Sequence, residues 1–200
     1  MIKIAIFASG SGSNAENIAQ YFSDKQEVEI PVIISNKAEA FVHQRAKQLG
    51  IESVTFSKKQ FEETDEVANL LTERKIDFVV LAGFLLKVPA NLLNNYPNRI
   101  VNIHPALLPK FGGKGMYGDR VHEAVVAAGE KESGITIHYI NENYDEGDVI
   151  FQATCNVATS DTAHDVAEKV HALEYKYFPA IIEKAIAALP GTVSLDKIND

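Results

Sequence analysis

The sequence predicts an α/β protein with an open, mostly parallel, twisted sheet, helices on both faces, and an antiparallel extension in the C-terminal half. Three observations support this prediction. Short apolar runs alternate with segments of helical periodicity through the first half of the 200-residue chain, which is the pattern of a parallel sheet with helical crossovers. A glycine-rich turn follows the first apolar run, as in Rossmann-like folds. Beyond Pro105, two β-like runs flank a polar turn.

The first quarter of the chain contains three predicted strands and two predicted helices. Ile2–Ala8 is a continuous apolar run that ends at glycines, which is typical of a strand buried on both faces. In the helix predicted at Ala15–Phe22, Ile18, Ala19 and Phe22 share one face. The pattern continues with a strand at Val28–Ser35, a helix at Ala38–Leu49 that Gly50 closes, and a strand at Glu52–Phe56.

The next segment repeats the alternation. Apolar residues at helical spacing predict a helix near Lys59–Arg74, and Phe78–Leu81 is a strongly β-forming run. Pro89 suits the first turn of a short helix that extends to about Asn95. Ile100–His104 is another predicted strand, because it is apolar and stops at a proline.

The remainder of the chain departs from this alternation. Phe111–Gly118 is rich in glycine and is predicted to be a loop, and a helix follows at Val121–Ala128. Strands at Ile135–Ile140 and Val149–Val157 flank a polar turn, so we expect an antiparallel pair, and one long helix at Thr162–Ala188 follows. We expect residues 1–188 to form a single domain and residues 189–200 to form a short C-terminal tail.

Composition excludes several classes of protein. The net charge is −8, with 27 acidic and 19 basic residues, and no basic patch is visible, so nucleic-acid binding is not expected. No apolar run approaches the roughly 20 residues that span a bilayer, and no signal peptide is evident, so we expect a cytoplasmic protein. The single Cys155 has no partner for a disulfide or a zinc cluster and is expected to be a small buried hydrophobe.

The glycine-rich turn after the first strand predicts an anion site. Residues 10–15 read Gly-Ser-Gly-Ser-Asn-Ala, and the N–H groups that open a helix suit a phosphate. The same residues satisfy the relaxed dinucleotide fingerprint, but the second strand ends Ser-Asn-Lys at 35–37 and lacks the carboxylate that binds ribose. A monophosphate site is therefore favoured over NAD, with a plain tight turn as the alternative.

The strand end at residues 101–105 predicts a catalytic site. Asn102 and His104 are two residues apart in a strand and so project to the same side. An asparagine amide can donate to an oxyanion as a carbonyl carbon becomes tetrahedral, and a histidine can exchange protons near neutral pH. A carboxylate would orient His104 and favour its charged form. Asp145 lies in the polar turn at 141–148, but composition does not select it from its acidic neighbours.

Four segments together carry a resemblance to a known family: Gly-Ser-Gly-Ser-Asn at 10–14, Leu-Ala-Gly-Phe at 81–84, Asn-Ile-His-Pro-Ala-Leu-Leu-Pro at 102–109 and Asp-Glu-Gly at 145–147. From residue 2 to about 186 the chain resembles the phosphoribosylglycinamide formyltransferases. The third segment is specific to folate-dependent formyltransferases as a superfamily, and the first narrows the resemblance to the purine enzymes. These enzymes transfer the formyl group of 10-formyltetrahydrofolate, a co-substrate, to the amine of phosphoribosylglycinamide, without a metal.

The resemblance implies a role for each matching residue. Asn102, His104 and Asp145 would be catalytic, and Asn102 would also touch the formyl donor. His138 would support the catalytic pair. The implied substrate-binding residues are Ser11, Gly12, Ser13 and Asn14 at the phosphate and Glu174 at the ribose; the implied folate-binding residues are Leu85, Leu86, Lys87 and Val88. The partners would be these two small molecules, and the sequence does not determine whether the chain forms a homodimer.

The sequence departs from the common family pattern at three places. Leu86 stands where many relatives have arginine, Glu146 alters the turn after Asp145, and residues 111–118 differ from the better-known loop. Three other functions compete with the formyltransferase. A methionyl-tRNA formyltransferase would need a further tRNA-binding domain, a formyltetrahydrofolate deformylase would use water in place of an amine, and a non-catalytic binding module would not need His104 or Asp145.

Overall fold

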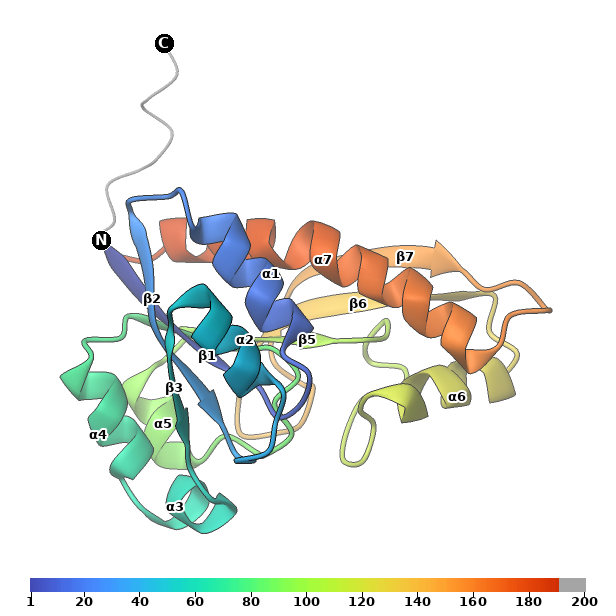
Figure 1. Cartoon of the computed structure of the whole chain (residues 1–200). Coiled ribbons are helices and arrows are strands. Elements are labelled where there is room, and N and C mark those ends of the chain that lie inside the picture. Colours follow the sequence, from blue (N-terminus) through green and yellow to red (C-terminus); the bar gives the residue numbers. More distant parts are fainter. Residues whose placement is uncertain (191–200) are drawn as a thin grey trace.

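The strands form one seven-stranded sheet in the order β3-β2-β1-β4-β5-β6-β7 (Figure 1). This computed structural model describes residues 1–190. β1 to β5 pair in parallel, whereas β6 and β7 are antiparallel to their neighbours. The predicted fold class is therefore confirmed. The strands are β1 (Ile2–Phe7), β2 (Val28–Ser35), β3 (Glu52–Thr55), β4 (Phe78–Leu81), β5 (Ile100–His104), β6 (Glu132–Tyr139) and β7 (Val149–Asn156).

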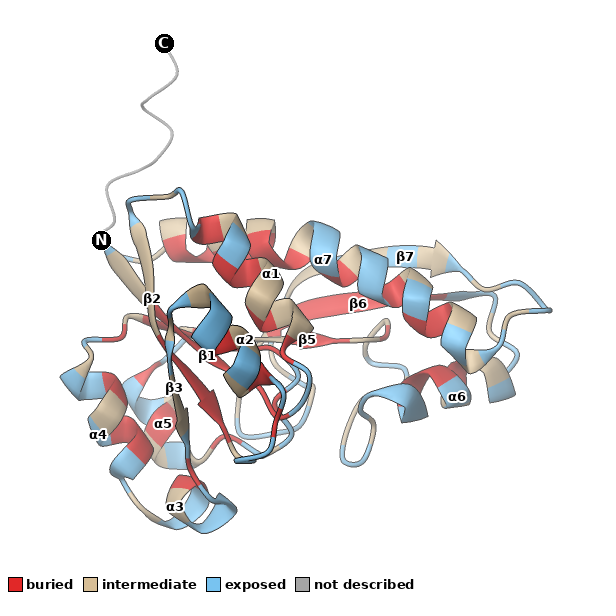
Figure 2. Ribbon diagram, viewed as in Figure 1, coloured by how far each residue is buried: buried red, intermediate tan, exposed pale blue. Residues whose placement is uncertain are grey.

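Helices cover both faces of the sheet, because the strands carry apolar side chains on both faces, as β1 illustrates. Ile4 and Ile6 are fully buried in one core, and Ala5 and Phe7 are buried in the other, because successive side chains of a strand point to opposite faces. The first core is closed by α1 (Ser13–Phe22), α2 (Val42–Leu49), α6 (Asp119–Ala127) and α7 (Ala163–Ala187); the second is closed by α3 (Lys58–Glu63), α4 (Glu66–Glu73) and α5 (Ala90–Asn95). Figure 2 shows the buried central strands between exposed outer helix faces.

The single helix predicted near 59–74 is wrong, because the structure divides it into α3 and α4. Ser57 begins α3 with a capping box in which its side chain accepts from the N–H of Gln60. Thr64 then adopts an extended conformation, φ −130° and ψ 167°, and its hydroxyl donates to the carbonyl of Gln60 at 2.6 Å. This local hydrogen bond competes with the helical one, so the helix ends and restarts at Glu66.

Several other boundaries differ by a few residues. The predicted helix at 38–49 begins only at Val42, whose N–H donates to the carbonyl of Gly10 at 3.1 Å instead of to a preceding turn of its own helix. α7 begins after Thr162, which forms a capping box with Asp165, and continues through Pro179. Cys155 was predicted to be buried but is half-buried, because it lies on the outermost strand. Its partial burial raises the pKa of the thiol.

Two further expectations concern the ends of the chain and the membrane. The predicted tail at 189–200 lies, from residue 191 onward, outside the described residues. Within residues 1–190, none of the helices combines the length and the apolar character needed to cross a bilayer.

Candidate active site

A cavity of about 620 Å³ lies at the carboxyl ends of β1, β4 and β5. The strand order reverses between β1 and β4, and ligands of open α/β sheets bind where the order reverses. The structure brings every predicted site residue to this one cavity. Its lining includes Ser11, Gly12, Ser13, Asn14, Leu85, Leu86, Lys87, Val88, Asn102, His104, Asp145 and Glu174.

The loop after β1 presents free backbone N–H groups to the cavity. Gly12 has φ 74°, a left-handed conformation that favours glycine, and it caps the N-terminus of α1. A Cβ atom at Gly12 would lie 2.4 Å from a side-chain carbon of Val42, so glycine is also required by the close approach of α2. Within residues 1–190 the N–H groups of Ser11, Gly12 and Ser13 donate to no other residue. The loop can therefore bind an anion such as phosphate.

Glu174 brings the long helix α7 to the same loop. Its carboxylate accepts a hydrogen bond from the Asn14 side-chain amide at 2.9 Å, and the residue is 7% exposed. Burial raises the pKa of Glu174 above its ordinary value, and the Asn14 amide and His171 oppose this shift. A buried carboxylate beside this loop is suited to accept hydrogen bonds from the hydroxyl groups of a ligand.

Glu174→Gln is expected to raise the free energy of unfolding near neutral pH. A carboxyl whose pKa is raised on folding contributes stability below its unfolded pKa and loses it as the pH rises through its folded pKa. Glutamine does not titrate, so the variant's advantage should be small below 4.5, the ordinary pKa, and should grow above it. Urea unfolding of both proteins across this pH range measures the difference. An advantage that does not change with pH would contradict the argument.

Asn102 and His138 face each other because β5 and β6 are antiparallel and pair these two residues directly. The Nδ1–H of His138 donates to the carbonyl of Tyr139 at 2.8 Å, which leaves Nε2 as an acceptor in the neutral ring. The side-chain N–H of Asn102 donates to this Nε2 at 3.1 Å. Burial lowers the pKa of His138 and so favours the neutral ring. Asn102 lines the cavity, and within residues 1–190 the second N–H of its amide has no acceptor.

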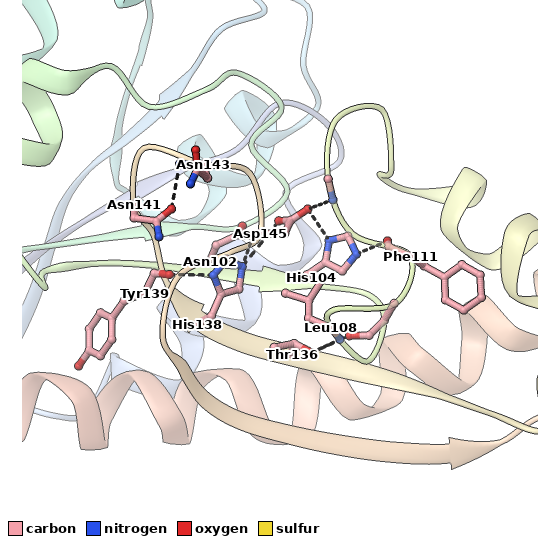
Figure 3. A network of polar contacts seen from close by, with 12 residues as sticks. Asn102, His104, Leu108, Phe111, Thr136, His138, Tyr139, Asn141, Asn143 and Asp145 are labelled. Atoms are coloured by element: carbon pink, nitrogen blue, oxygen red, sulfur yellow. Dashed lines mark hydrogen bonds and ion pairs between the residues drawn. The ribbon is translucent and has the colours of Figure 1, made fainter.

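His104, 3% exposed, lies beside Asn102 with its two ring nitrogens facing different groups (Figure 3). Its Nε2–H donates to the carbonyl of Phe111 at 2.7 Å, and Nδ1 lies 3.6 Å from the Oδ2 of Asp145. The second distance is longer than a hydrogen bond. The other oxygen of Asp145, Oδ1, lies 3.7 Å from His138 Nε2. The carboxylate therefore faces both rings.

The turn between β6 and β7 fixes the position of Asp145. Asp145 has φ 57°, a left-handed conformation that aspartate tolerates, and its Oδ2 accepts from the N–H of Gly113 at 2.8 Å. The turn is closed by the N–H of Tyr139, which donates to the carbonyl of Asp148 at 2.9 Å. A Cβ atom at Gly147 would lie 1.8 Å from the carbonyl oxygen of Tyr139, so the chain can pass there only with glycine.

The loop after β5 is held by Thr136, a fully buried residue of β6. Its hydroxyl accepts from the N–H of Leu108 at 3.0 Å (Figure 3). The same hydroxyl donates to the carbonyl of Ala106 at 2.7 Å. The side-chain amide of Gln152 donates to the same hydroxyl at 2.8 Å and to the carbonyl of Leu108 at 3.0 Å. These bonds join the β5 loop to the antiparallel strands.

The segment after β4 forms a more apolar part of the lining. The N–H of Leu85 donates to the hydroxyl of Ser9 at 2.9 Å, which ties this segment to the end of β1. Leu85 is 41% exposed, whereas Val88 is buried. The ammonium group of Lys87 lies 5.7 Å from the centre of the Tyr144 ring, so a cation reaches across toward the β6–β7 turn.

Two histidines of the cavity were not predicted. His122 of α6 and His171 of α7 line it, and their ring centres are 6.3 Å apart. Burial lowers the pKa of His122, and the nearby His171 lowers it further. His171 lies three residues before Glu174 and so on the same helical face, which was a usable signal; no comparable signal marked His122. Within residues 1–190, no three His, Cys, Asp or Glu side chains are grouped as metal ligands.

Comparison with known proteins gives consistent matches. The Formyl transferase family model matches residues 2–182. The chloroplastic phosphoribosylglycinamide formyltransferase of Arabidopsis thaliana is 39% identical over 90% of this chain, and the chain spans 64% of that protein's length. The phosphoribosylglycinamide formyltransferase of Bacillus subtilis is 32% identical over 93% of this chain and 95% of its own length. The crystal structure of the Bacillus halodurans enzyme of the same name superposes with a TM-score of 0.84, at 36% identity, over 96% of this chain and 99% of that one.

Proposed function

Because the chain belongs to the formyl transferase family, and within it to the phosphoribosylglycinamide formyltransferases, we propose that it transfers the formyl group of 10-formyltetrahydrofolate to the amine of phosphoribosylglycinamide. This reaction is a step of purine biosynthesis. Residues 1–188 would act as one domain, since α7 packs on α1, β6 and β7 and closes the same core as the first strand.

One observation carries the proposal: a single cavity has an anion-binding loop and a group of proton-exchanging and hydrogen-bonding side chains in its lining. The loop at 11–14 and Glu174 are suited to the phosphate and ribose of a phosphoribosyl substrate. Asn102, His104 and Asp145 are suited to a carbonyl transfer reaction. A substrate with a phosphate at one end and an amine at the other would meet both sets of groups at once.

The reaction would proceed by direct attack. The amine nitrogen bonds to the formyl carbon, the carbonyl oxygen becomes an oxyanion, and the bond from the formyl carbon to the folate nitrogen N10 then breaks. The amine loses one proton and N10 gains one. His104 would take the proton from the amine and return it to N10, and the Asp145 carboxylate, 3.6 Å away, would stabilise the imidazolium between the two steps.

Asn102 would stabilise the oxyanion. One of its two side-chain N–H bonds is used by the Nε2 of His138, which holds the amide plane in a fixed orientation. The second N–H is then directed without any rearrangement at the moment of reaction, and such preorganised donors are most effective in buried sites. His138 would thus act through Asn102 by positioning it.

The folate would lie against the segment Leu85–Val88. Its apolar side chains suit the flat pterin ring. Leu86 supplies no charge where many relatives have arginine. Lys87, the next residue, is the cation that this segment contributes to the cavity.

The test is a spectrophotometric assay of 10-formyltetrahydrofolate consumption, with and without phosphoribosylglycinamide. We expect turnover only when the amine is present. Equal turnover without the amine would identify a deformylase, because water would then be the attacking group. Tight binding of both ligands without turnover would identify a binding module. Either of these results would replace the proposed function.

A further inference from the structure

Two residues of α2 donate hydrogen bonds to the loop between β1 and α1. The N–H of Val42 donates to the carbonyl of Gly10 at 3.1 Å. The Nε–H of Arg45, one helical turn further along α2, donates to the carbonyl of Ser11 at 2.9 Å. Two consecutive carbonyl oxygens of the loop are therefore directed toward α2.

This arrangement determines where the following N–H groups point. In a trans peptide unit the C=O and N–H bonds are antiparallel, and the cis peptide bond of the described chain is at Leu108–Pro109, so these loop units are trans. With the carbonyls of Gly10 and Ser11 turned toward α2, the N–H groups of Ser11 and Gly12 point away from it. Both residues line the cavity, so these N–H groups are directed to the cavity side.

Arg45 is itself fixed by two neighbours. Its Nη1 pairs with the carboxylate of Glu16 in the first turn of α1, and its guanidinium lies 5.2 Å from the centre of the Phe41 ring. The guanidinium thus bridges the loop carbonyl and α1 through two of its nitrogen atoms, as the rigid fork of arginine permits. Within the described chain Arg45 is not among the residues that line the cavity.

We propose that Arg45 is a positioning residue for the phosphate of the substrate, because its bond to the Ser11 carbonyl aims the Gly12 N–H into the anion site. The proposal rests on the proposed function, in which the loop binds that phosphate. Arg45 acts through the loop and does not touch the substrate. Its loss would free the Ser11–Gly12 peptide unit to rotate, and the phosphate would then lose a charge-assisted hydrogen bond.

The test compares Arg45→Met and Arg45→Lys with the wild-type enzyme on two substrates, phosphoribosylglycinamide and its dephosphorylated riboside. For Arg45→Met the KM of the phosphorylated substrate should rise about tenfold to a hundredfold, with little change in kcat. Both constants for the riboside should stay unchanged, because no phosphate is bound. Arg45→Lys keeps the charge but cannot bridge Ser11 and Glu16, so the KM of the phosphorylated substrate should rise in this variant too. If Arg45→Met does not fold, Arg45→Lys alone tests the proposal.

Arg74→Met is the matched control, since Arg74 forms an ion pair with Glu52 away from the loop. It should leave both substrates unaffected. An unchanged KM in the Arg45 variants, or an equal loss with both substrates, would overturn the proposal. Calorimetric titration with inorganic phosphate gives a readout independent of turnover. Weaker phosphate binding in the Arg45 variants than in the wild type supports the positioning role. If the wild type transfers no formyl group but this difference is observed, the proposed function fails and the positioning role stands.

Discussion

His104→Ala is expected to lower kcat by about 10²- to 10⁴-fold, the range that general acid–base catalysis contributes. The substituted enzyme retains the loop at 11–14 and Glu174, so it should still bind the phosphoribosyl substrate. What it loses is the ring that, in the proposed mechanism, would take the amine proton and return it to the folate nitrogen. Steady-state kinetics of formyl transfer, with substrate binding measured separately by calorimetry, check both parts of this expectation.

His164→Ala is the control for the loss of an imidazole elsewhere. The His164 side chain is 82% exposed at the start of α7, so its removal should leave kcat unchanged. Thermal unfolding of both variants shows whether the buried His104 has only a structural role. Turnover of His104→Ala at the wild-type rate would contradict the assigned proton transfer, as would a loss of activity that matches the fraction of unfolded protein.

Asn102→Ala is expected to cost about 3 kcal/mol of transition-state stabilisation, which lowers kcat by roughly 10²- to 10³-fold. The physical reason is the loss of the N–H that would meet the oxyanion. The variant also leaves the Nε2 of His138 without its 3.1 Å donor. The kinetic effect should fall on kcat, because the oxyanion forms only as the amine attacks.

Asn95→Ala serves as the matched control, because Asn95 is exposed at the end of α5 and lies outside the cavity lining. It should retain the wild-type kcat. If Asn102→Ala also retains it, the oxyanion donor lies elsewhere in the cavity. If Asn102→Ala raises only the KM of the folate, Asn102 binds the donor and does not stabilise the transition state.

Much of the fold could be predicted from the sequence because its strands have an unambiguous pattern. Ile4–Phe7 and Phe78–Leu81 are buried in the centre of the sheet, and a continuous apolar run is what burial on both faces requires. The glycine loop and the Asn102–His104 pair were predictable for a related reason. Each directly follows or ends such a strand, so the parallel sheet itself brings them to one edge.

Other features depend on contacts between distant segments and could not be derived from local pattern. The break between α3 and α4 is caused by the Thr64 side chain, which competes with the helix for a carbonyl. His122 reaches the cavity only because α6 packs on α7. Asp145 was selected by family resemblance alone; its partner, the N–H of Gly113, lies 32 residues away in sequence. The catalytic roles and the cytoplasmic location stay predictions.

The turn that carries Asp145 has a consequence for how the length of this chain can vary. Surface connections usually tolerate inserted residues. One added residue between β6 and β7 would shift the following chain by up to about 3.8 Å, which is more than the 2.8 Å bond from Asp145 to the Gly113 N–H can absorb. On the C-terminal side of Asp145, a Cβ atom at Gly147 would lie 1.8 Å from the carbonyl oxygen of Tyr139, so the backbone cannot shift there to accommodate an added residue. Insertions and deletions should therefore be confined to other loops, and this hairpin should keep a constant number of residues wherever the carboxylate is retained.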